Sequence, residues 1–188
     1  MIDVALIYIR QVLDEYLSVQ LGVDKGCVIL NNLSASDPAI LEQNRNKVVV
    51  TLVNLEYESN KQFYGGQVRA VDQVNQVNPA LFFNLDILLS ASFDNYIEAL
   101  KQLTLVVAFF QEHLSLDRTN SPALPEGLSA LKFEIENSPS HKAHDLWTAL
   151  GVGYLPSMLY KVRHVAVQSG QIKGSSTTVR EIAGTVHP

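Results

Sequence analysis

Three kinds of side chain in this sequence have the potential for chemistry: a histidine pair, a lone cysteine and a carboxylate within an apolar run. His141 and His144 lie three residues apart in HKAHD, next to Asp145. On a helix these groups could approach one metal ion, but zinc sites take three or four ligands and no distant third ligand stands out. We therefore expect a solvated helix start and no metal site.

Cys27 is the only cysteine of the 188 residues, and it lies in the apolar stretch CVIL. A thiol in such a place is usually an inert small hydrophobe, and a chain with one cysteine is compatible with folding in a reducing cytoplasm. The sequence has no G-x-S-x-G motif for a nucleophilic serine, and GVGY lacks the third glycine of a dinucleotide site. His113 and His164 have no evident partner in the sequence, and nothing in their spacing indicates a pair with Cys27. We expect no enzymatic activity and no cofactor, although a small enzyme using Asp86 with a histidine is an alternative.

Asp86 lies in LFFNLDILLSASF, the most apolar run of the chain. Successive side chains of a strand alternate between its two faces. The odd positions from Leu81 to Phe93 are all apolar and predict a core face, whereas the even positions are mixed and include Asn84, Asp86, Ser90 and Ser92. A buried polar group needs a partner. We therefore expect either one partly wet face or a partner elsewhere.

Lys161 and Arg163 supply candidate partners, because they share the odd face of another predicted strand with Leu159, Val165 and Val167. If the two strands are neighbours, Asp86 can pair with Lys161 or with Arg163 across them. The alternative is that Asn84, Asp86, Lys161 and Arg163 are merely solvated. Asp14, Glu15, Glu134 and Glu136 have the spacing of solvated faces.

The periodicity of the chain predicts α+β architecture. Residues 2–21 form an amphipathic helix with Asp3 as N-cap and Gly22 as stop. A second helix over 94–114 starts at a capping box of Asn95 and Glu98, and a third ends at Gly151. The apolar stripe of the helix over 94–114 is Tyr96, Leu100, Leu103, Val107, Phe110 and Leu114, extended by Leu105, Val106 and Phe109. Strands are expected at 27–33, 47–59, 81–93, 128–138 and 157–170. The expected sheet is mostly antiparallel, with four or five strands and helices packed on one face.

Two polar segments extend this arrangement. Residues 60–79 are rich in Asn and Gln and predict a long connection or a projecting hairpin, with Phe63, Tyr64 and Arg69 as candidate contact residues. The Ser/Thr/Gly-rich tail includes Arg180 and is expected to hold an edge strand at 177–182 or to lack order. We therefore expect one α+β domain over 1–168 and a C-terminal extension over 169–188, which would be an edge strand or a subunit-linking arm.

Composition restricts the partners. The apolar fraction is 47%, the charged fraction 18%, the net charge −5 and the pI about 5.5. A nucleic-acid-binding domain usually has a basic face, so these values argue against such a partner. No apolar run reaches the ~20 residues that span a bilayer, and the first 20 residues interrupt their apolar pattern with charges, unlike a signal peptide. Low charge is instead typical of a surface that a protein partner covers.

Several stretches, taken in order, resemble one known family. They are IDVALIYIRQVLDEYL, VVVTLVNLEYE, PALFFNLDILLSASFDNYIEALKQLTLVVAFFQ and DLWTALGVGYLPSMLYKVR. Together they cover roughly residues 1–167 and resemble the Pvc-type cap proteins, the tail terminators of extracellular contractile injection systems. These are phage-tail-like particles such as the antifeeding prophage and the Photorhabdus virulence cassette.

The resemblance implies a structural role and a fold akin to phage tail terminators. It implies a homo-hexameric ring on the baseplate-distal end of the inner tube, which ends tube growth and holds the last sheath layer. The implied partners are the inner tube protein and the sheath protein, in a particle assembled in the bacterial cytoplasm and then released. A chaperone or adaptor that binds tube or sheath protein transiently is the other assembly role. Asn84, Asp86, Lys161, Arg163, Phe63, Tyr64, Arg69 and Arg180 are the candidate subunit or partner contacts.

Overall fold

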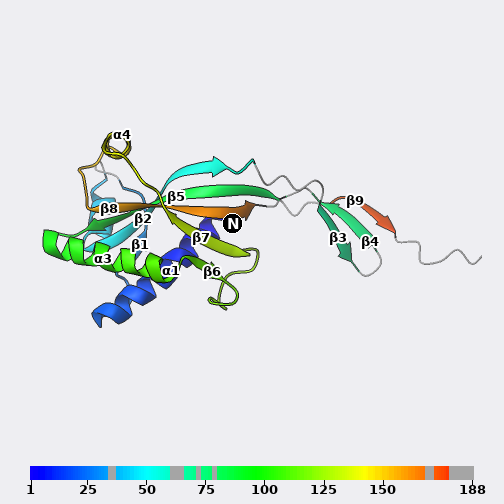
Figure 1. The fold of residues 1–188 in the computed structure, drawn as a ribbon, viewed down its shortest axis with the longest axis horizontal. Helices are drawn as coiled ribbons and strands as arrows, with labels where there is room; N and C mark the ends of the chain where they lie inside the picture. The colour runs from blue at the N-terminus through cyan, green and yellow to red at the C-terminus, as the bar shows by residue number, and fades with distance from the viewer. Residues whose placement is uncertain (34–36, 60–65, 71–72, 78–79, 168–171, 178–188) are drawn as a thin grey trace, which may run out of the picture.

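A computed structural model describes residues 1–33, 37–59, 66–70, 73–77, 80–167 and 172–177. Its main element is a curled six-stranded sheet in the order β1-β2-β5-β8-β7-β6 (Figure 1). The strands are β1 (Val28–Leu30), β2 (Lys47–Tyr57), β5 (Leu81–Ser92), β6 (Ser115–Asp117), β7 (Ala130–Ile135) and β8 (Ser157–Val167). All neighbouring pairs are antiparallel except β1 and β2, which are parallel. The prediction of a mostly antiparallel α+β fold is confirmed.

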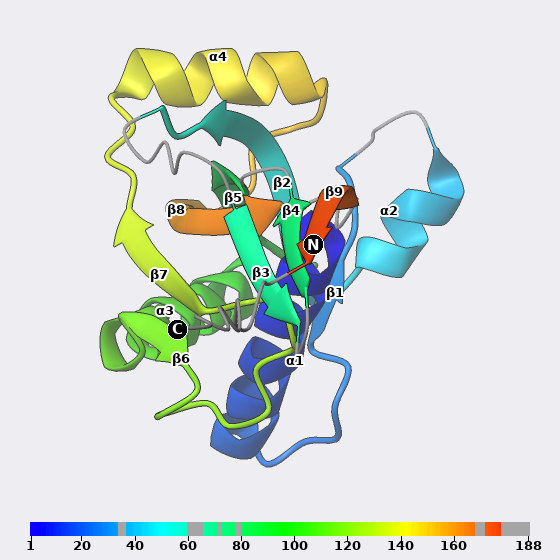
Figure 2. The same cartoon turned by 90° about the vertical axis from the view of Figure 1, so that its right-hand side faces the viewer.

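Helices lie on both faces of the sheet, which differs from the expectation that they cover one face. α1 (Ile2–Leu21) and α3 (Tyr96–Glu112) pack on one face, here called the helix side, and α4 (Ser140–Leu150) lies over the other, the α4 side (Figures 1 and 2). α2 (Pro38–Asn44) lies beside the β1–β2 end of the sheet (Figure 2). On the α4 side, Trp147 packs with Val49 and Leu88. The amphipathic pattern shows that α4 has an apolar face but not which side of the sheet receives it.

The ends of the two long helices follow their predicted signals in part. Gly22 ends α1 in the left-handed conformation, with φ 65°, as predicted. The N-cap of α1 is Met1 and not Asp3, whose carboxylate instead binds the Met1 amine at 2.7 Å. Asn95 caps α3 by accepting from the Ile97 and Glu98 N–H groups, at 2.9 and 3.3 Å. The side chain of Glu98 bonds Lys101 at 2.7 Å.

The buried face of α3 is rotated from the predicted stripe. Ala99, Gln102, Val106, Phe109 and Phe110 are buried, whereas Tyr96, Leu100 and Leu114 of the predicted stripe are exposed. α3 carries apolar residues on most of its circumference, so spacing alone selects no single face. Contact with α1 and β5 selects the side with the small Ala99.

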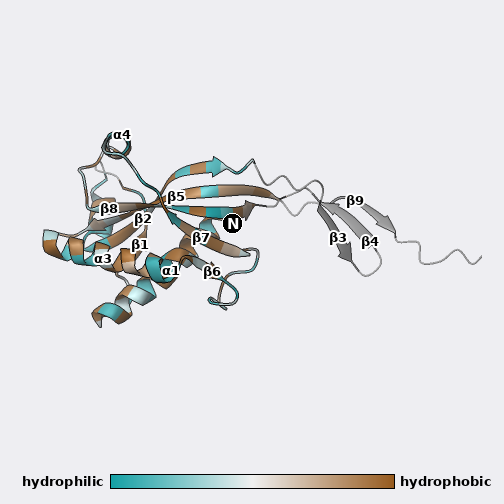
Figure 3. Cartoon of the chain, viewed as in Figure 1, coloured by the Kyte–Doolittle hydropathy of each residue, from teal (hydrophilic) through white to brown (hydrophobic). Residues whose placement is uncertain are grey.

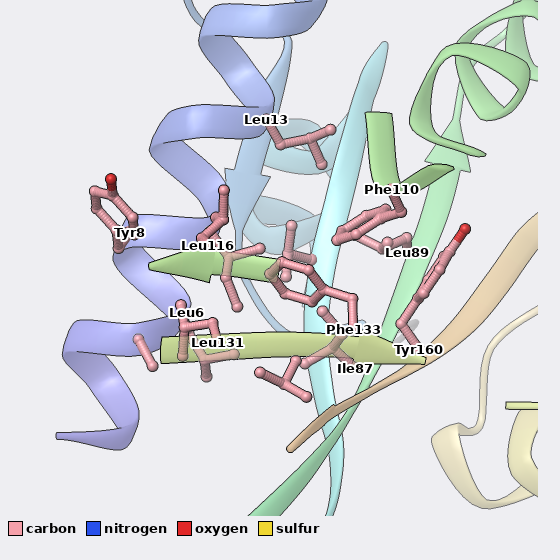
Figure 4. Packing of buried hydrophobic residues seen from close by; sticks show 14 of the residues in the cluster. Leu6, Tyr8, Leu13, Ile87, Leu89, Phe110, Leu116, Leu131, Phe133 and Tyr160 are labelled. Carbon is pink, nitrogen blue, oxygen red and sulfur yellow. The ribbon is translucent and has the colours of Figure 1, made fainter. Parts of the chain in front are cut away.

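The helix-side core contains aromatic residues from α3, β7 and β8 (Figure 4). The Phe110 ring stacks on Tyr160 at a centroid distance of 4.2 Å and meets Phe133 edge-on at 4.9 Å. Ile87 and Leu89 of β5, Leu13 of α1 and Leu131 of β7 fill the remaining space. This core therefore packs α1 and α3 against the central strand β5 and against β7 and β8.

Asp14 ties α1 to the start of β1 and is not the solvated residue that its helical position predicts. Its carboxylate is 2% exposed, accepts from the Gly26 N–H with both oxygens at 3.0 Å, and accepts from the Val28 N–H at 2.9 Å. Arg10, one turn earlier, lies 3.6 Å away. The loop that returns from α1 thus supplies backbone donors to a buried charge.

A second sheet has three strands in the order β3-β4-β9. They are β3 (Gly66–Ala70), β4 (Gln73–Val77) and β9 (Ile172–Thr177), and both pairs are antiparallel. This sheet lies beyond the ends of β2, β5 and β8 (Figure 1). The hairpin predicted within 60–79 is confirmed as β3–β4. The described tail strand is at 172–177 and pairs with β4; from residue 178 on, the strand expected at 177–182 lies outside the described residues.

Substitution of Asp14 tests the tie between α1 and β1. We expect Asp14→Ala to lower the free energy of unfolding by about 3 kcal/mol, because it leaves the buried Val28 N–H and the partly buried Gly26 N–H without their acceptor. Urea unfolding followed by circular dichroism measures the change. Glu15→Ala, on the exposed side of the same helix, is the matched control and should change stability by less than about 0.5 kcal/mol. Equal stability of the two variants would contradict this role of Asp14.

Candidate functional site

Two bulges place polar side chains together on the α4 side of the sheet. In β2 the register shifts between Leu52 and Asn54, so Asn54 lies opposite Asp86. Between β5 and β8 the register shifts at Asn84, and His164 takes a positive φ of 64° there. A bulge adds a residue to one strand and so reverses which face the following residues occupy.

The β8 bulge corrects the predicted faces of that strand. Lys161 shares a face with Leu159 of the α4-side cluster, as expected. Val165, however, is buried in the helix-side core together with Val162. The predicted common face of Lys161, Val165 and Val167 is therefore wrong, because strict alternation is lost between Val162 and Val165.

Lys161 is the centre of a carboxylate-rich cluster. Its ammonium lies 2.8 Å from Glu56 Oε2, 3.7 Å from Asp86 Oδ1 and 3.9 Å from Glu136 Oε2, and its side chain is only 13% exposed. Asp86 and Lys161 are direct cross-strand neighbours. Of the two predicted pairs, the structure thus contains Asp86–Lys161. Asp86 Oδ2 also accepts from the Asn54 amide at 3.0 Å.

Arg163 extends the cluster toward β7. Its Nε donates to Glu134 Oε2 at 2.8 Å, and its Nη1 lies 3.8 Å from Glu58 Oε2. Asn84 of β5 bonds to both neighbouring segments: its side-chain amide donates to Glu58, next to the end of β2, at 3.1 Å, and its side-chain oxygen accepts from the His164 N–H of β8 at 3.2 Å. The four residues predicted as contacts on β5 and β8 therefore lie in two adjoining groups, one around Lys161 and one around Arg163, and the charge of Glu56 acts on both cations.

The two groups together, here called the carboxylate cluster, hold five acids around two bases: Glu56, Glu58, Asp86, Glu134 and Glu136 around Lys161 and Arg163. The hydrogen bond to Glu56 raises the pKa of Lys161 against the opposing effect of burial, and the hydrogen bond to Glu134 raises that of Arg163. Both bases therefore stay charged at neutral pH. Glu134 and Glu136 are ion-paired and not merely solvated, and the cluster has an excess of negative charge.

Glu56, Glu58 and Asn54 join this cluster without having been predicted as site residues. Their alternation with Leu55 and Tyr57 in the sequence shows that they share a face, and this signal could have identified them. Figure 3 shows hydrophilic residues among hydrophobic ones along β2, β5 and β8. What the sequence lacks is the register that places this face beside Asp86.

The predicted wet face of β5 is closed within the chain. Every residue from Asn84 to Ala91 is buried. The cluster covers Asn84 and Asp86, and Trp147 of α4 packs on Leu88. Ser90 is fully buried as well. The even face of β5 therefore needs no partner subunit to cover it.

The other sequence candidates do not converge on a reactive site. His141, His144 and Asp145 lie on exposed positions of α4, and the described residues contain no group of three or more potential metal ligands. His113 Nδ1 lies 2.9 Å from the Phe109 carbonyl oxygen on the helix side, and Cys27 Sγ contacts Ser18 and Asp24. Asp86 lies on the α4 side, so the sheet separates it from His113. None of the described helices is long and apolar enough to cross a membrane.

The structure does not test the contact roles of the other four predicted residues. Phe63, Tyr64 and Arg180 are outside the described residues. Arg69 is in β3, paired with Val74 of β4, so the structure gives its backbone register. Their proposed contact roles remain predictions.

Comparison with known proteins identifies relatives of this fold. The profile of the family described as "Pvc16 N-terminal domain" matches residues 8–181. The fold is similar to the PVC sheath/tube terminator of an extracellular contractile injection system in its extended state, with 13% identity, a TM-score of 0.58 and 94% of this chain covered. It is also similar to the anti-feeding prophage cap, a tube-terminating cap, with 14% identity, a TM-score of 0.62 and 97% covered. The chain spans 62% of the length of each. No curated protein sequence matches.

Removal of the central cation tests the carboxylate cluster. We expect Lys161→Met to lower the free energy of unfolding by about 3 kcal/mol at neutral pH, because Asp86 and Glu56 lose their buried counter-charge. The folded pKa of Lys161 is above its usual value near 10.5, so this stabilisation is complete below the unfolded pKa and disappears as pH rises through the folded pKa.

Urea titrations of parent and Lys161→Met at neutral pH and above pH 10.5 measure both effects. The difference between the two proteins should narrow at the higher pH. Lys142→Met, an exposed position on α4, controls for loss of a lysine and should stay within about 0.5 kcal/mol of the parent. A difference that is independent of pH would argue against the ion pairs as its cause.

Proposed function

This chain belongs to the Pvc16 N-terminal domain family, the Pvc-type caps, and we propose that it caps the inner tube of a contractile injection system. The family match across residues 8–181 is the observation that carries the proposal. The cap would sit as a homo-hexameric ring on the baseplate-distal end of the tube. There it would end tube and sheath polymerisation and hold the last sheath layer.

The similarity in fold to a sheath/tube terminator and to a tube-terminating cap supports this proposal. A growing tube presents the same surface after each added ring, so a terminator must match that surface on one side and offer a different one on the other. Both faces of β5 are already buried within the chain. The contacts of a cap would therefore be made by the edges of the six-stranded sheet, by its outer side chains and by the β3-β4-β9 sheet.

The partners of the cap would be the inner tube protein and the sheath protein. We assign residues 1–168 to the terminator-like domain and 169–188 to an extension that links neighbouring subunits. The function is structural and needs neither catalysis nor a cofactor. The particle would assemble in the bacterial cytoplasm and act outside the cell, as the extracellular system of the similar terminator does.

Particles assembled with and without this chain test the proposal. We expect its absence to give over-long tubes and loss of sheath from the baseplate-distal end, because nothing stops subunit addition there. Negative-stain electron microscopy of purified particles measures tube length and sheath retention. Tubes of normal length and intact sheath would contradict a cap.

A variant lacking residues 62–76 gives a second arm of the same experiment. The described strands of this segment, β3 and β4, pair in a sheet separate from the six-stranded one, so the domain should unfold at an unchanged temperature. The variant should nevertheless fail to restore normal tube length if the β3–β4 hairpin makes cap contacts. Full restoration of tube length by the deletion variant would show that the β3–β4 hairpin makes no essential cap contact. If the parent chain binds free tube protein but has no effect on tube length, the adaptor role is favoured.

A further inference from the structure

The six-stranded sheet ends in two unlike edges that leave backbone groups open. β1 forms one edge. On the other side β6 pairs only with Ala130–Lys132 of β7, so Glu134 and Ile135 extend beyond it. Figure 2 shows β1 and β7 at opposite sides of the sheet. An open strand edge is a template for pairing with another chain.

The β7 edge offers a hydrogen-bond donor beside an apolar groove. The Phe133 N–H donates to the Leu114 carbonyl and the Glu136 N–H to the Leu159 carbonyl of β8. By the alternation of an antiparallel ladder, the Ile135 N–H therefore points away from β8. Ile135 is 53% exposed and Leu114 69%. They border a groove of about 440 Å³ between α3 and β7, whose one charged lining residue among those described is Glu134.

The β1 edge has a groove of similar size and opposite charge. The Cys27 carbonyl and the Asn31 N–H bond to β2, so the N–H groups of Val28 and Leu30 point outward; that of Val28 donates to Asp14, and that of Leu30 is the donor this edge offers. A groove of about 370 Å³ lies here between α1 and β1, and within the described chain its charged lining residues are Arg10 and Lys47. The carboxylate beside Arg10, Asp14, is buried. Ile7 of α1, 45% exposed, is the apolar projection of this edge.

The two edges match when their faces are aligned. Lys47 is two residues before Val49 of the α4-side cluster and so lies on the α4 side, as Glu134 does through its pair with Arg163. Val28 and Phe133 both belong to the helix-side core, which places Ile7 and Ile135 on the helix side. Joining the edges into one continuous sheet thus brings base to acid on one face and apolar to apolar on the other.

We propose that the β1 edge of one copy docks on the β7 edge of the next, so that the sheet continues from subunit to subunit. A second copy occupies each edge, because the two edges are complementary. Lys47 of the β1 edge would lie beside Glu134 of the β7 edge, and Ile7 beside Ile135. The two edges differ, so the contact is heterologous and generates a ring where its rotation closes. This inference rests on the proposed ring-forming cap and names the surfaces that form the ring.

Two substitutions at exposed positions test it, one on each edge: Ile7→Asp and Ile135→Asp. Sedimentation velocity, alone and with tubes present, should show the parent above monomer mass and each variant as a folded monomer. Val19→Asp, at a 73% exposed position of α1 in neither groove, should assemble like the parent. Circular dichroism and thermal unfolding establish that all three variants are folded.

Mixing the two variants is the decisive step. The intact β1 edge of Ile135→Asp can meet the intact β7 edge of Ile7→Asp, so the mixture should give a one-to-one dimer and nothing larger. A mixture that stays monomeric, or one that forms full rings, overturns the proposal, as does a parent that remains monomeric under every condition. Rings formed by both single variants would overturn this contact and leave the cap function standing. Edge-dependent assembly that never locates to tube ends would instead refute the cap function.

Discussion

Strand β5 is paired along both of its edges and covered on both of its faces, so the residues from Asn84 to Ala91 must be satisfied inside the chain. On the helix side this is achieved by apolar packing of Leu85, Ile87 and Leu89. On the α4 side, Asn84 and Asp86 require partners, and burial of an unpaired carboxylate would cost several kcal/mol. The carboxylate cluster, brought together by the two bulges, supplies partners for both, and α4 covers the neighbouring Leu88.

Much of the fold is readable from the sequence because local patterns determine it. Strand alternation marks β5, β7 and β8, Asn95 and Gly22 mark helix ends, and opposite charges on Asp86 and Lys161 predict their pairing. The α3 face could not be predicted, because apolar residues surround that helix. The sequence also did not predict the burial of Asp14, because that burial depends on the loop before β1. Nor did it predict the face of Val165, because that face depends on the bulge in β8.

For the carboxylate cluster too, the sequence predicts which residues share a face of one strand but not which strands lie side by side. Glu56 and Glu58 share a face by parity, and so do Lys161 and Arg163. Only the order β2-β5-β8 brings these faces together, and that order arises from pairings between strands far apart in the sequence, such as Leu81 of β5 with Val167 of β8. Its physical result is a charged patch in which two partly buried cations pair with carboxylates across four neighbouring strands, β2, β5, β8 and β7.

A subunit whose central strand is buried on both faces from Asn84 to Ala91 can fold before assembly, because this part of the sheet is covered within the chain. Association is then left to edges, exposed side chains and the β3-β4-β9 sheet. Such a division suits a terminator, which must fold first and bind a tube end later. A core buried within the chain is also compatible with many different surfaces, in keeping with a similar fold at only 13–14% identity in the two similar structures.

The most direct test of the cap function is the growth of tubes from purified inner tube protein in the presence of increasing amounts of this chain. Electron microscopy measures the length distribution, and a label on the chain gives its position. We expect mean tube length to fall as the ratio of chain to tube protein rises, with the label at one end only. Unchanged lengths, or label distributed along the tube wall, would contradict the account.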